Sequence, residues 1–217
     1  MFVKLMCQDS RMINIFSGVK GLVSHGNELR SLLDTTRPEI VLVSISPPEV
    51  DGLKMFLKSP FEMNLSDYEI IYGVRLAKYG EVMTPPPIYI EAVKYSVDNA
   101  KEIAGIDMDE EKYGETYIKH VKGSHLIRHS IRKKRVLNAD YHDTTPYEFA
   151  EAWNSRVNSI KGLSLVDIER AEDMVGKITE FLHEKYTTDH LIVIDHEFYK
   201  PVITRLNAKG CMGPATV

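Results

Sequence analysis

Cysteine is scarce in this chain of 217 residues. Cys7 and Cys211 are the only two, and they lie at opposite ends of the sequence without forming a CxxC pair. This spacing argues against a thiolate metal site and against a disulfide framework. Two such thiols fit a reducing compartment, so we expect a cytoplasmic protein.

Long hydrophobic runs are also absent. A membrane-spanning helix needs about 20 consecutive apolar residues, and no run here approaches that length. The stretch Met1–Ser10 carries Gln8, Asp9 and Ser10 where a signal peptide would need a longer apolar core. We therefore expect a protein that is not exported and has no membrane partner.

The chain has no excess of charge of one sign. It carries 27 Lys and Arg against 31 Asp and Glu, a net charge of −4, so it lacks the basic bias of a nucleic-acid-binding protein. The exception is Lys119–Arg135, which only Tyr117 and Tyr141 flank with aromatic rings. Platforms for single strands interleave rings with cations, so a solvated helix face is the favoured interpretation and a nucleic-acid partner is not expected. A phosphate-binding or nucleic-acid-binding arm is the alternative.

Two groups of sequence motifs are missing as well. Gly18-Val19-Lys20-Gly21 has neither the glycine spacing of a dinucleotide loop nor the ending of a P-loop. No GxSxG motif is present, and neither cysteine lies in a recognisable nucleophile context. Nucleotide binding and covalent catalysis are therefore not indicated.

The hydrophobic residues that are present alternate between strand-like and helix-like patterns. Short apolar runs end in polar loops, and the segments between them space their apolar residues by three and four. This order predicts an α/β fold with a mostly parallel sheet and helices on both faces. The expected strands are Met12–Phe16, Ile40–Ile45, Glu81–Met83, Ile103–Ile106 and Leu191–Ile194.

Capping signals mark several of the expected helices. Ser66 followed by Glu69 forms a capping box, and Thr145-Pro146-Tyr147-Glu148 combines an N-cap, a proline at the first helical position and a capping-box glutamate. No repeat or linker divides the chain, so we expect one domain over residues 1–209 and a flexible tail over 210–217. Residues 113–143 are the least regular and predict a helical or irregular excursion.

An acidic pair follows one of the expected strands directly. Asp107 and Asp109 leave the run Ile103–Ile106, and in an open α/β sheet ligands bind at the carboxyl ends of the strands. The two carboxylates can converge on one divalent cation. In the alternative interpretation, Asp109 caps the helix that begins around Glu110.

A second polar group follows the last expected strand. Asp195-His196-Glu197 lies at the end of Leu191–Ile194, which places an imidazole and two carboxylates on the same sheet edge as Asp107. Histidine is the usual base or metal ligand near neutral pH. In the alternative interpretation, Asp195 caps the final helix and His196 is solvated in its first turn.

Several short motifs occur along the chain in an order that carries a family resemblance. They are Gly18 to Gly21, Arg37 to Ser44, Ala100 to Asp109, Glu169 to Met174 and Val193 to His196. Their order resembles the TraB/PrgY family and the wider superfamily of ChaN-like and erythromycin-esterase-like proteins, to which the Tiki metalloproteases look related. The resemblance covers the chain from about Met12 to Leu206.

The chain departs from this family at four positions, one of which is Met108 in place of the arginine of an Asp-Arg-Asp motif. Gly21 stands where the family has a histidine, Ser44 stands where it has a glutamate, and Tyr199 takes the place of a second histidine in an ungapped alignment. The two acids of this motif are matched by Asp107 and Asp109. A site without one histidine and one glutamate has few ligands left for a catalytic divalent metal.

The resemblance implies an α/β fold with its site at the strand ends and, in active relatives, metal-assisted hydrolase or peptidase chemistry. Our first hypothesis is a domain with a degenerate hydrolase centre that binds a small molecule or a protein through Asp107, Asp109, Arg170 and His196. Further candidate ligand-binding residues are Gly18, Ser44, Glu169 and Tyr199.

The alternative hypothesis is a divalent-metal-dependent hydrolase. In it Asp107, Asp109 and His196 hold the metal, His196 also acts as the base, and Arg170 stabilises an anionic group. A homodimer is a plausible assembly under either hypothesis.

Overall fold

The computed structural model describes residues 1–8, 11–139, 143–185 and 189–213, with the side chains of 129, 130, 132–137 and 185 left out. One mixed sheet of six strands forms the centre, in the order β4-β3-β5-β2-β1-β6. β2, β5, β3 and β4 are parallel, and β1 is antiparallel to both of its neighbours. The strands are β1 (Phe2–Cys7), β2 (Met12–Gly18), β3 (Ile40–Val43), β4 (Glu102–Gly105), β5 (His190–Asp195) and β6 (Cys211–Met212).

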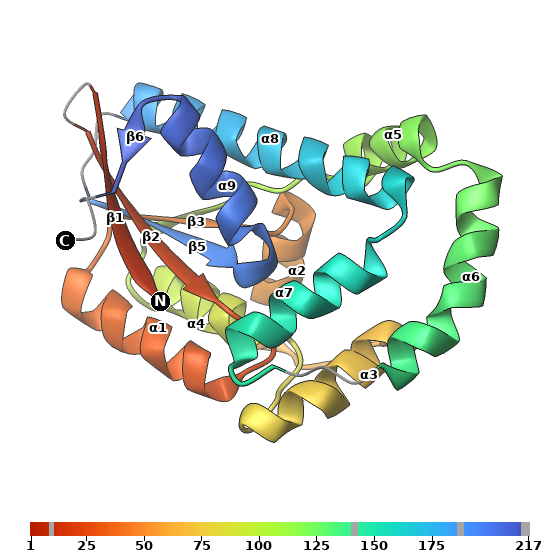
Figure 1. Cartoon of the computed structure of the whole chain (residues 1–217). Coiled ribbons are helices and arrows are strands. Elements are labelled where there is room, and N and C mark those ends of the chain that lie inside the picture. Colours follow the sequence, from red (N-terminus) through yellow and green to blue (C-terminus); the bar gives the residue numbers. More distant parts are fainter. Residues whose placement is uncertain (9–10, 140–142, 186–188, 214–217) are drawn as a thin grey trace.

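Helices cover both faces of this sheet, as the sequence predicts. α8 and α9 lie over one face, and α1, α2 and α4 lie over the other (Figure 1). The helices are α1 (Val23–Thr36), α2 (Pro47–Lys58), α3 (Asp67–Leu76), the short 3-10 turn η1 (Ala77–Tyr79), α4 (Pro87–Asp98), α5 (Glu110–His120), α6 (Gly123–Asn138), α7 (Pro146–Val157), α8 (Lys161–Lys185) and α9 (His196–Ala208).

The central strands are buried on both faces because alternate side chains enter different cores. In β3, Leu42 joins the core under α8 and α9, whereas Val41 joins the core under α1 and α4. In β5, Ile192 and Val193 divide in the same way. A strand buried on both sides reads as a continuous apolar run, which is why these two strands are predictable from the sequence.

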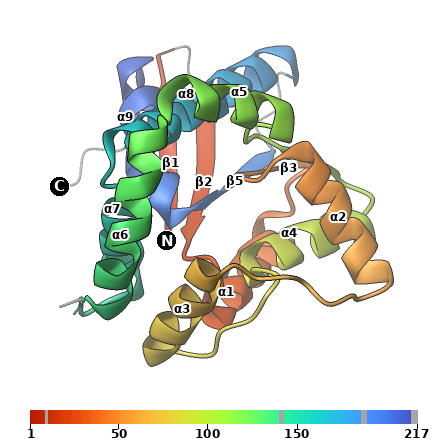
Figure 2. The ribbon, with the colours of Figure 1, turned by 90° about the vertical axis from the view of Figure 1, so that its right-hand side faces the viewer.

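A third apolar cluster lies beyond the carboxyl ends of the parallel strands. Val19 and Leu22, which follow β2, belong to this cluster together with Tyr72 of α3 and Trp153 of α7. Figure 2 shows α6 reaching from α5 toward α3 and α7 on this side of the molecule. The expected excursion over 113–143 is thus largely helical, and it belongs to the layer that surrounds the strand ends.

The predicted caps are present. Ser66 and Glu69 form a complete capping box at α3, and Thr145 and Glu148 form one at α7. Each satisfies backbone N–H groups that the first turn of a helix leaves without partners.

One expected strand is wrong, and two strands were not anticipated. Residues 81–83 contribute only an isolated bridge between Val82 and Leu22, because the prolines that follow send the chain into α4 instead of extending a strand. β1 and β6 add an antiparallel edge to the sheet. Part of the expected flexible tail is therefore ordered, since Cys211–Met212 pairs with β1.

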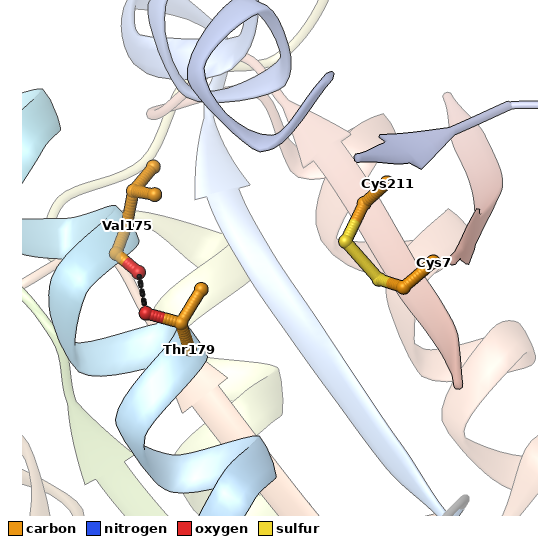
Figure 3. Close-up of a disulfide and its surroundings, with 4 residues drawn as sticks. All are labelled: Cys7, Val175, Thr179 and Cys211. Atoms are coloured by element: carbon orange, nitrogen blue, oxygen red, sulfur yellow. Dashed lines mark hydrogen bonds between the residues drawn. A yellow bond between two sulfur atoms is a disulfide. The ribbon is translucent and has the colours of Figure 1, made fainter. Parts of the chain in front are cut away.

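The expectation of two separate thiols is also wrong. Cys7 and Cys211 are opposite each other in the β1–β6 ladder and form a disulfide (Figure 3). Both cysteines belong to the core under α8 and α9. Within α8, Thr179 donates a hydrogen bond to the carbonyl of Val175 over 3.0 Å (Figure 3). Disulfides are typical of oxidising compartments and of intracellular proteins of hyperthermophiles, so the cysteines do not support the expected reducing compartment.

Within the described ranges, no helix combines the length and the apolar composition needed to cross a membrane.

Candidate functional site

The parallel strands end together, and their last residues bring polar side chains to one edge. Ser17 is the last residue but one of β2, Ser44 follows β3, and Asp107 lies two residues beyond β4. Asp195 ends β5, and His196 begins α9. We call this edge with its side chains the strand-end site. The site has three parts, which are the ion pair of Asp107, the hydrogen bonds of His196, and the carboxylates that surround Lys20.

Asp107 is held in a buried ion pair. Arg170 of α8 donates through Nε to Oδ1 of Asp107 over 3.2 Å and through Nη2 to Oδ2. Lys177 donates to the Asp107 carbonyl over 2.6 Å. Although burial opposes the charge of Arg170, the carboxylate of Asp107 raises the pKa of this guanidinium. The structure thus brings together Asp107 and Arg170, two of the predicted residues, as mutual partners.

Asp109 has a different role from Asp107. It is the N-cap of α5, where Oδ1 accepts a hydrogen bond from the Lys112 N–H over 2.8 Å. The capping interpretation of Asp109 is therefore confirmed. Nowhere in the described part of the chain do three His, Cys, Asp or Glu side chains form a group able to hold a metal. Asp107, Asp109 and His196 are each bonded to a different partner, so the structure does not bring the predicted metal set together.

His196 lies at the start of α9 and is buried, in contrast to the solvated position considered from the sequence. Its Nε2 is 3.1 Å from Oε1 of Glu151, and its Nδ1 is 2.9 Å from Oγ of Ser17. A carboxylate only accepts hydrogen bonds, so in the neutral ring Nε2 carries the proton and Ser17 donates to Nδ1. Ser17, His196 and Glu151 form one chain of hydrogen bonds.

The imidazole is kept neutral by its surroundings. Burial lowers the pKa of His196, and this effect outweighs the carboxylate of Glu151, which raises it. The ring of Tyr199 stacks on it at 5.8 Å between centroids, and the Tyr147 ring lies at 4.7 Å. Tyr199, another predicted residue, is therefore adjacent to His196.

A pocket of about 520 Å³ opens between α7 and α9 beside this chain of hydrogen bonds. Carboxylates outnumber cations in its lining, and the ammonium of Lys200 lies 2.6 Å from Oε2 of Glu151. The polar lining includes Glu148, Glu151, Asn154, His196, Glu197 and Lys200. Helix α7 and the N-terminal turn of α9 thus form its two walls.

Glu197 connects the pocket to a cation behind it. Its Oε1 is 2.9 Å from Nζ of Lys20, and Oδ2 of Asp195 lies 3.2 Å from the same ammonium. Burial raises the pKa of Glu197 and nearby Asp195 adds to the rise, while Lys20 opposes it. Burial opposes the charge of Lys20, yet the two carboxylates raise its pKa well above the ordinary value.

The hydroxyl of Tyr72 lies in the same region and is buried. The side chain is 7% exposed, and the Tyr72 hydroxyl has no hydrogen-bond partner among the described residues. Nζ of Lys20 is 5.8 Å from the centre of its ring. Burial raises the pKa of Tyr72 well above its ordinary value, and the carboxylates of Asp195 and Glu197 act in the same direction.

Two predicted ligand-binding residues support the site from within the fold. The Ser44 hydroxyl accepts from the Asp195 N–H over 2.8 Å and lies 3.0 Å from the hydroxyl of Tyr89. Gly18 has no room for a side chain, because a Cβ there would lie 2.9 Å from Cγ2 of Ile88. Both residues are buried and hold the strand ends in place.

Glu169, in contrast, does not join the strand-end site. Its Oε1 binds Nζ of Lys119 at 2.6 Å and Nε2 of His120 at 2.7 Å, and so links α8 to α5. Lys119 is thus engaged within the protein. Of the basic stretch up to Arg135, the side chains of 129, 130 and 132–135 lie outside the described part of the chain.

Sequence reasoning missed several residues of the site, and Glu151 and Tyr72 show why. Glu151 and Tyr72 lie on α7 and α3, far from the strand ends in the sequence, and only the third apolar cluster brings their helices to this edge. Glu148 and Glu151 are three apart on one helix, which is a weak signal, since such spacing is common on solvated helix faces.

Another pocket, of about 510 Å³, lies at the opposite end of the sheet, near the start of β3 and β4. Its lining includes Arg37, Tyr95 and the ion pair of Glu39 with Lys101. No histidine lines it, and it is remote from the carboxyl ends where α/β sheets bind ligands. We therefore place the candidate site at the α7–α9 pocket.

Comparisons with known proteins give little further information. No protein-family model matches the chain, and no curated protein matches it. Among solved structures, a mutant of the erythromycin esterase EreC in its open conformation is similar with a TM-score of 0.35 and 12% identity. The match covers 82% of this chain and 59% of the esterase, so the chain spans less than two thirds of that protein. Membership of the TraB/PrgY family remains a prediction.

Proposed function

We propose that this protein binds a small organic cation, such as a polyamine, in the pocket between α7 and α9. The observation that carries the proposal is the lining of the pocket, which has three carboxylates, Glu148, Glu151 and Glu197, and one ammonium, that of Lys200, while Lys20 pairs with Glu197 from behind the lining. A carboxylate that loses solvent without full compensation favours a positively charged partner. The raised pKa of Glu197 indicates such a lack of compensation.

The neutral imidazole of His196 adds a polar group to the pocket without adding positive charge. Burial lowers the pKa of His196, so near neutral pH the ring does not repel a cationic ligand. Glu151 holds the ring through Nε2, and one turn of α9 further on it also binds Lys200. A ligand ammonium can compete with Lys200 for this carboxylate.

A binding role agrees better with the geometry than covalent catalysis does. Ser17, His196 and Glu151 follow the order of a Ser-His-acid triad, in which the hydroxyl donates to the ring and the ring donates to the carboxylate. However, Ser17 is 0% exposed within β2, so a substrate cannot reach its hydroxyl in this conformation. This supports the hypothesis of a degenerate hydrolase centre.

The test is a thermal-shift screen at constant ionic strength. Spermidine and other amines are compared with citrate and phosphate, because a ligand of the folded state raises the melting temperature by mass action. We expect amines to raise it in the wild type and to lose this effect in Glu197→Gln. Glu184→Gln, on the exposed end of α8, is the matched control and should respond like the wild type.

Two results would overturn the proposal. One is stabilisation by citrate or phosphate with no response to amines, since this would mean that Lys20 or Lys200 dominates the site. The other is an equal amine response in the wild type, Glu197→Gln and Glu184→Gln, which would place amine binding elsewhere on the surface.

A further inference from the structure

Three methionines lie side by side at the antiparallel edge of the sheet. Met6 of β1 is directly opposite Met12 of β2 on one side and Met212 of β6 on the other. Directly opposite residues in antiparallel strands point to the same face, with Cβ atoms about 4.5–5.5 Å apart. The row therefore gathers three of the chain's nine methionines at one register position.

The disulfide fixes the face on which this row lies. Cys7 and Cys211 are bonded to each other and buried on the face covered by α8 and α9. Because successive side chains of a strand alternate, Met6 and Met212 point to the opposite face. Their exposures agree, at 49% for Met6 and 60% for Met212. The thioethers of Met6 and Met212 are thus accessible, whereas the cysteine sulfurs are bonded to each other on the other face.

We propose that Met6, Met12 and Met212 form a binding site for a soft monovalent cation, Cu(I), on this outer face of the sheet edge. Thioethers select Cu(I) over hard cations, and methionine side chains are unbranched and flexible enough to converge on one ion. No group of His, Cys, Asp or Glu suited to a harder metal exists among the residues that the structure describes. The proposal is independent of the function proposed for the strand-end site.

The experiment uses the full chain with its disulfide intact, and a thiol assay verifies that no free thiol is present. Ag(I) is the redox-inert probe, and the methyl signals of ¹³C-labelled methionine are followed by NMR. We expect the signals of Met6, Met12 and Met212 to shift together and to saturate at one equivalent of Ag(I). Met55, which is exposed on α2, should not shift.

Substitution of the central residue tests the site directly. Met6→Leu keeps the volume of the side chain and should leave the fold intact. Loss of one ligand should weaken Cu(I) binding, measured in competition with bicinchoninate, by at least the loss of about 10–100-fold that is typical when a residue supporting a metal ligand is changed. Met212→Leu should do the same, and the control Met55→Leu should bind like the wild type.

The proposal fails if Met6→Leu and Met212→Leu bind Ag(I) as well as the wild type does. It also fails if methionines outside the row give the shifts, or if the metal binds only after the disulfide has been reduced, because the ligands would then be thiolates. The melting temperature of each variant shows whether weaker binding reflects a lost ligand or a lost fold. If both variants are unfolded, the Ag(I) titration of the wild type remains the test. Shifts confined to the methyl signals of Met6, Met12 and Met212 support the proposal, and shifts of other methionines contradict it.

Discussion

Nε2 of His196 lies 3.1 Å from Oε1 of Glu151, and this contact joins the end of β5 to helix α7 across 45 residues of sequence. The two residues do not belong to a common sequence motif. The contact places a neutral imidazole and a carboxylate in the same pocket, and the proposed binding function depends on it. This contact and the other groups of the strand-end site lead to measurable expectations.

Removal of the Glu151 charge should lower the pKa of His196 further. Burial lowers this pKa, and Glu151 is the group that most strongly opposes the decrease. In Glu151→Gln we therefore expect the ring to titrate at lower pH than in the wild type, as measured by an NMR pH titration of its Cε1–H proton. Glu148→Gln, on the same helix but without contact to the ring, should leave the titration unchanged. An upward shift in Glu151→Gln would contradict this account.

Removal of the Tyr72 hydroxyl should not destabilise the protein. The group is buried and has no hydrogen-bond partner in the part of the chain that the structure describes, and such a group costs about 1–3 kcal/mol when it is left unsatisfied. Tyr72→Phe should therefore keep or raise the free energy of unfolding measured with urea. Tyr89→Phe is the comparison, because it removes a hydroxyl bonded to Ser44 and should lower this free energy. Equal losses in both variants would show that Tyr72 has a partner such as a bound water.

Loss of Arg170, the partner of Asp107, should lower the free energy of unfolding much more than loss of a surface ion pair does. Arg170→Met leaves the Asp107 carboxylate buried, and a broken buried pair costs about 3–5 kcal/mol. Because a quarter of the Arg170 side chain is exposed, we expect a value near the lower end. Arg30→Met removes the exposed pair with Glu91 and should cost about 0–1 kcal/mol. Similar losses in urea unfolding would refute the structural role of Asp107.

Glu197 should make the protein less stable as the pH rises through the acidic range. Its pKa in the folded state is raised above the ordinary value of 4.5, so between these two values the folded state binds more protons than the unfolded state. The free energy of unfolding contributed by this group then falls with increasing pH. In urea unfolding at pH 4.5–7, wild type should lose stability relative to Glu197→Gln. If the wild type instead became more stable relative to Glu197→Gln as the pH rises, the pKa of Glu197 would be lowered and not raised in the folded state.

The parts of the fold that could be predicted are those that depend on local sequence. Ile40–Val43 reads as a buried strand because it is apolar throughout, and Asp109 reads as a cap because helices need an acceptor at their N-terminus. Residues 81–83 form a single bridge and not the expected strand, since a short apolar run lacks the context that separates the two.

The parts that could not be predicted depend on pairing between distant segments. Cys7 and Cys211 are separated by 204 residues and meet only because β6 returns to the edge formed by β1. The strand-end position of Asp107 and His196 was predictable from strand order, but their partners Arg170 and Glu151 come from helices whose orientation the pattern does not specify. For this reason the structure does not bring the predicted metal set together, although its residues follow the strands at the expected edge.

The central claim is that a cationic ligand occupies the pocket beside His196 and Glu197. Its most direct test is an NMR titration of spermidine into the wild-type protein near neutral pH, observed at the Cε1–H and Cδ2–H protons of His196 at constant ionic strength. We expect saturable shifts of both protons in the wild type and in Glu184→Gln, and none in Glu197→Gln. Saturable amine binding detected by calorimetry while the His196 protons remain unmoved would contradict the claim.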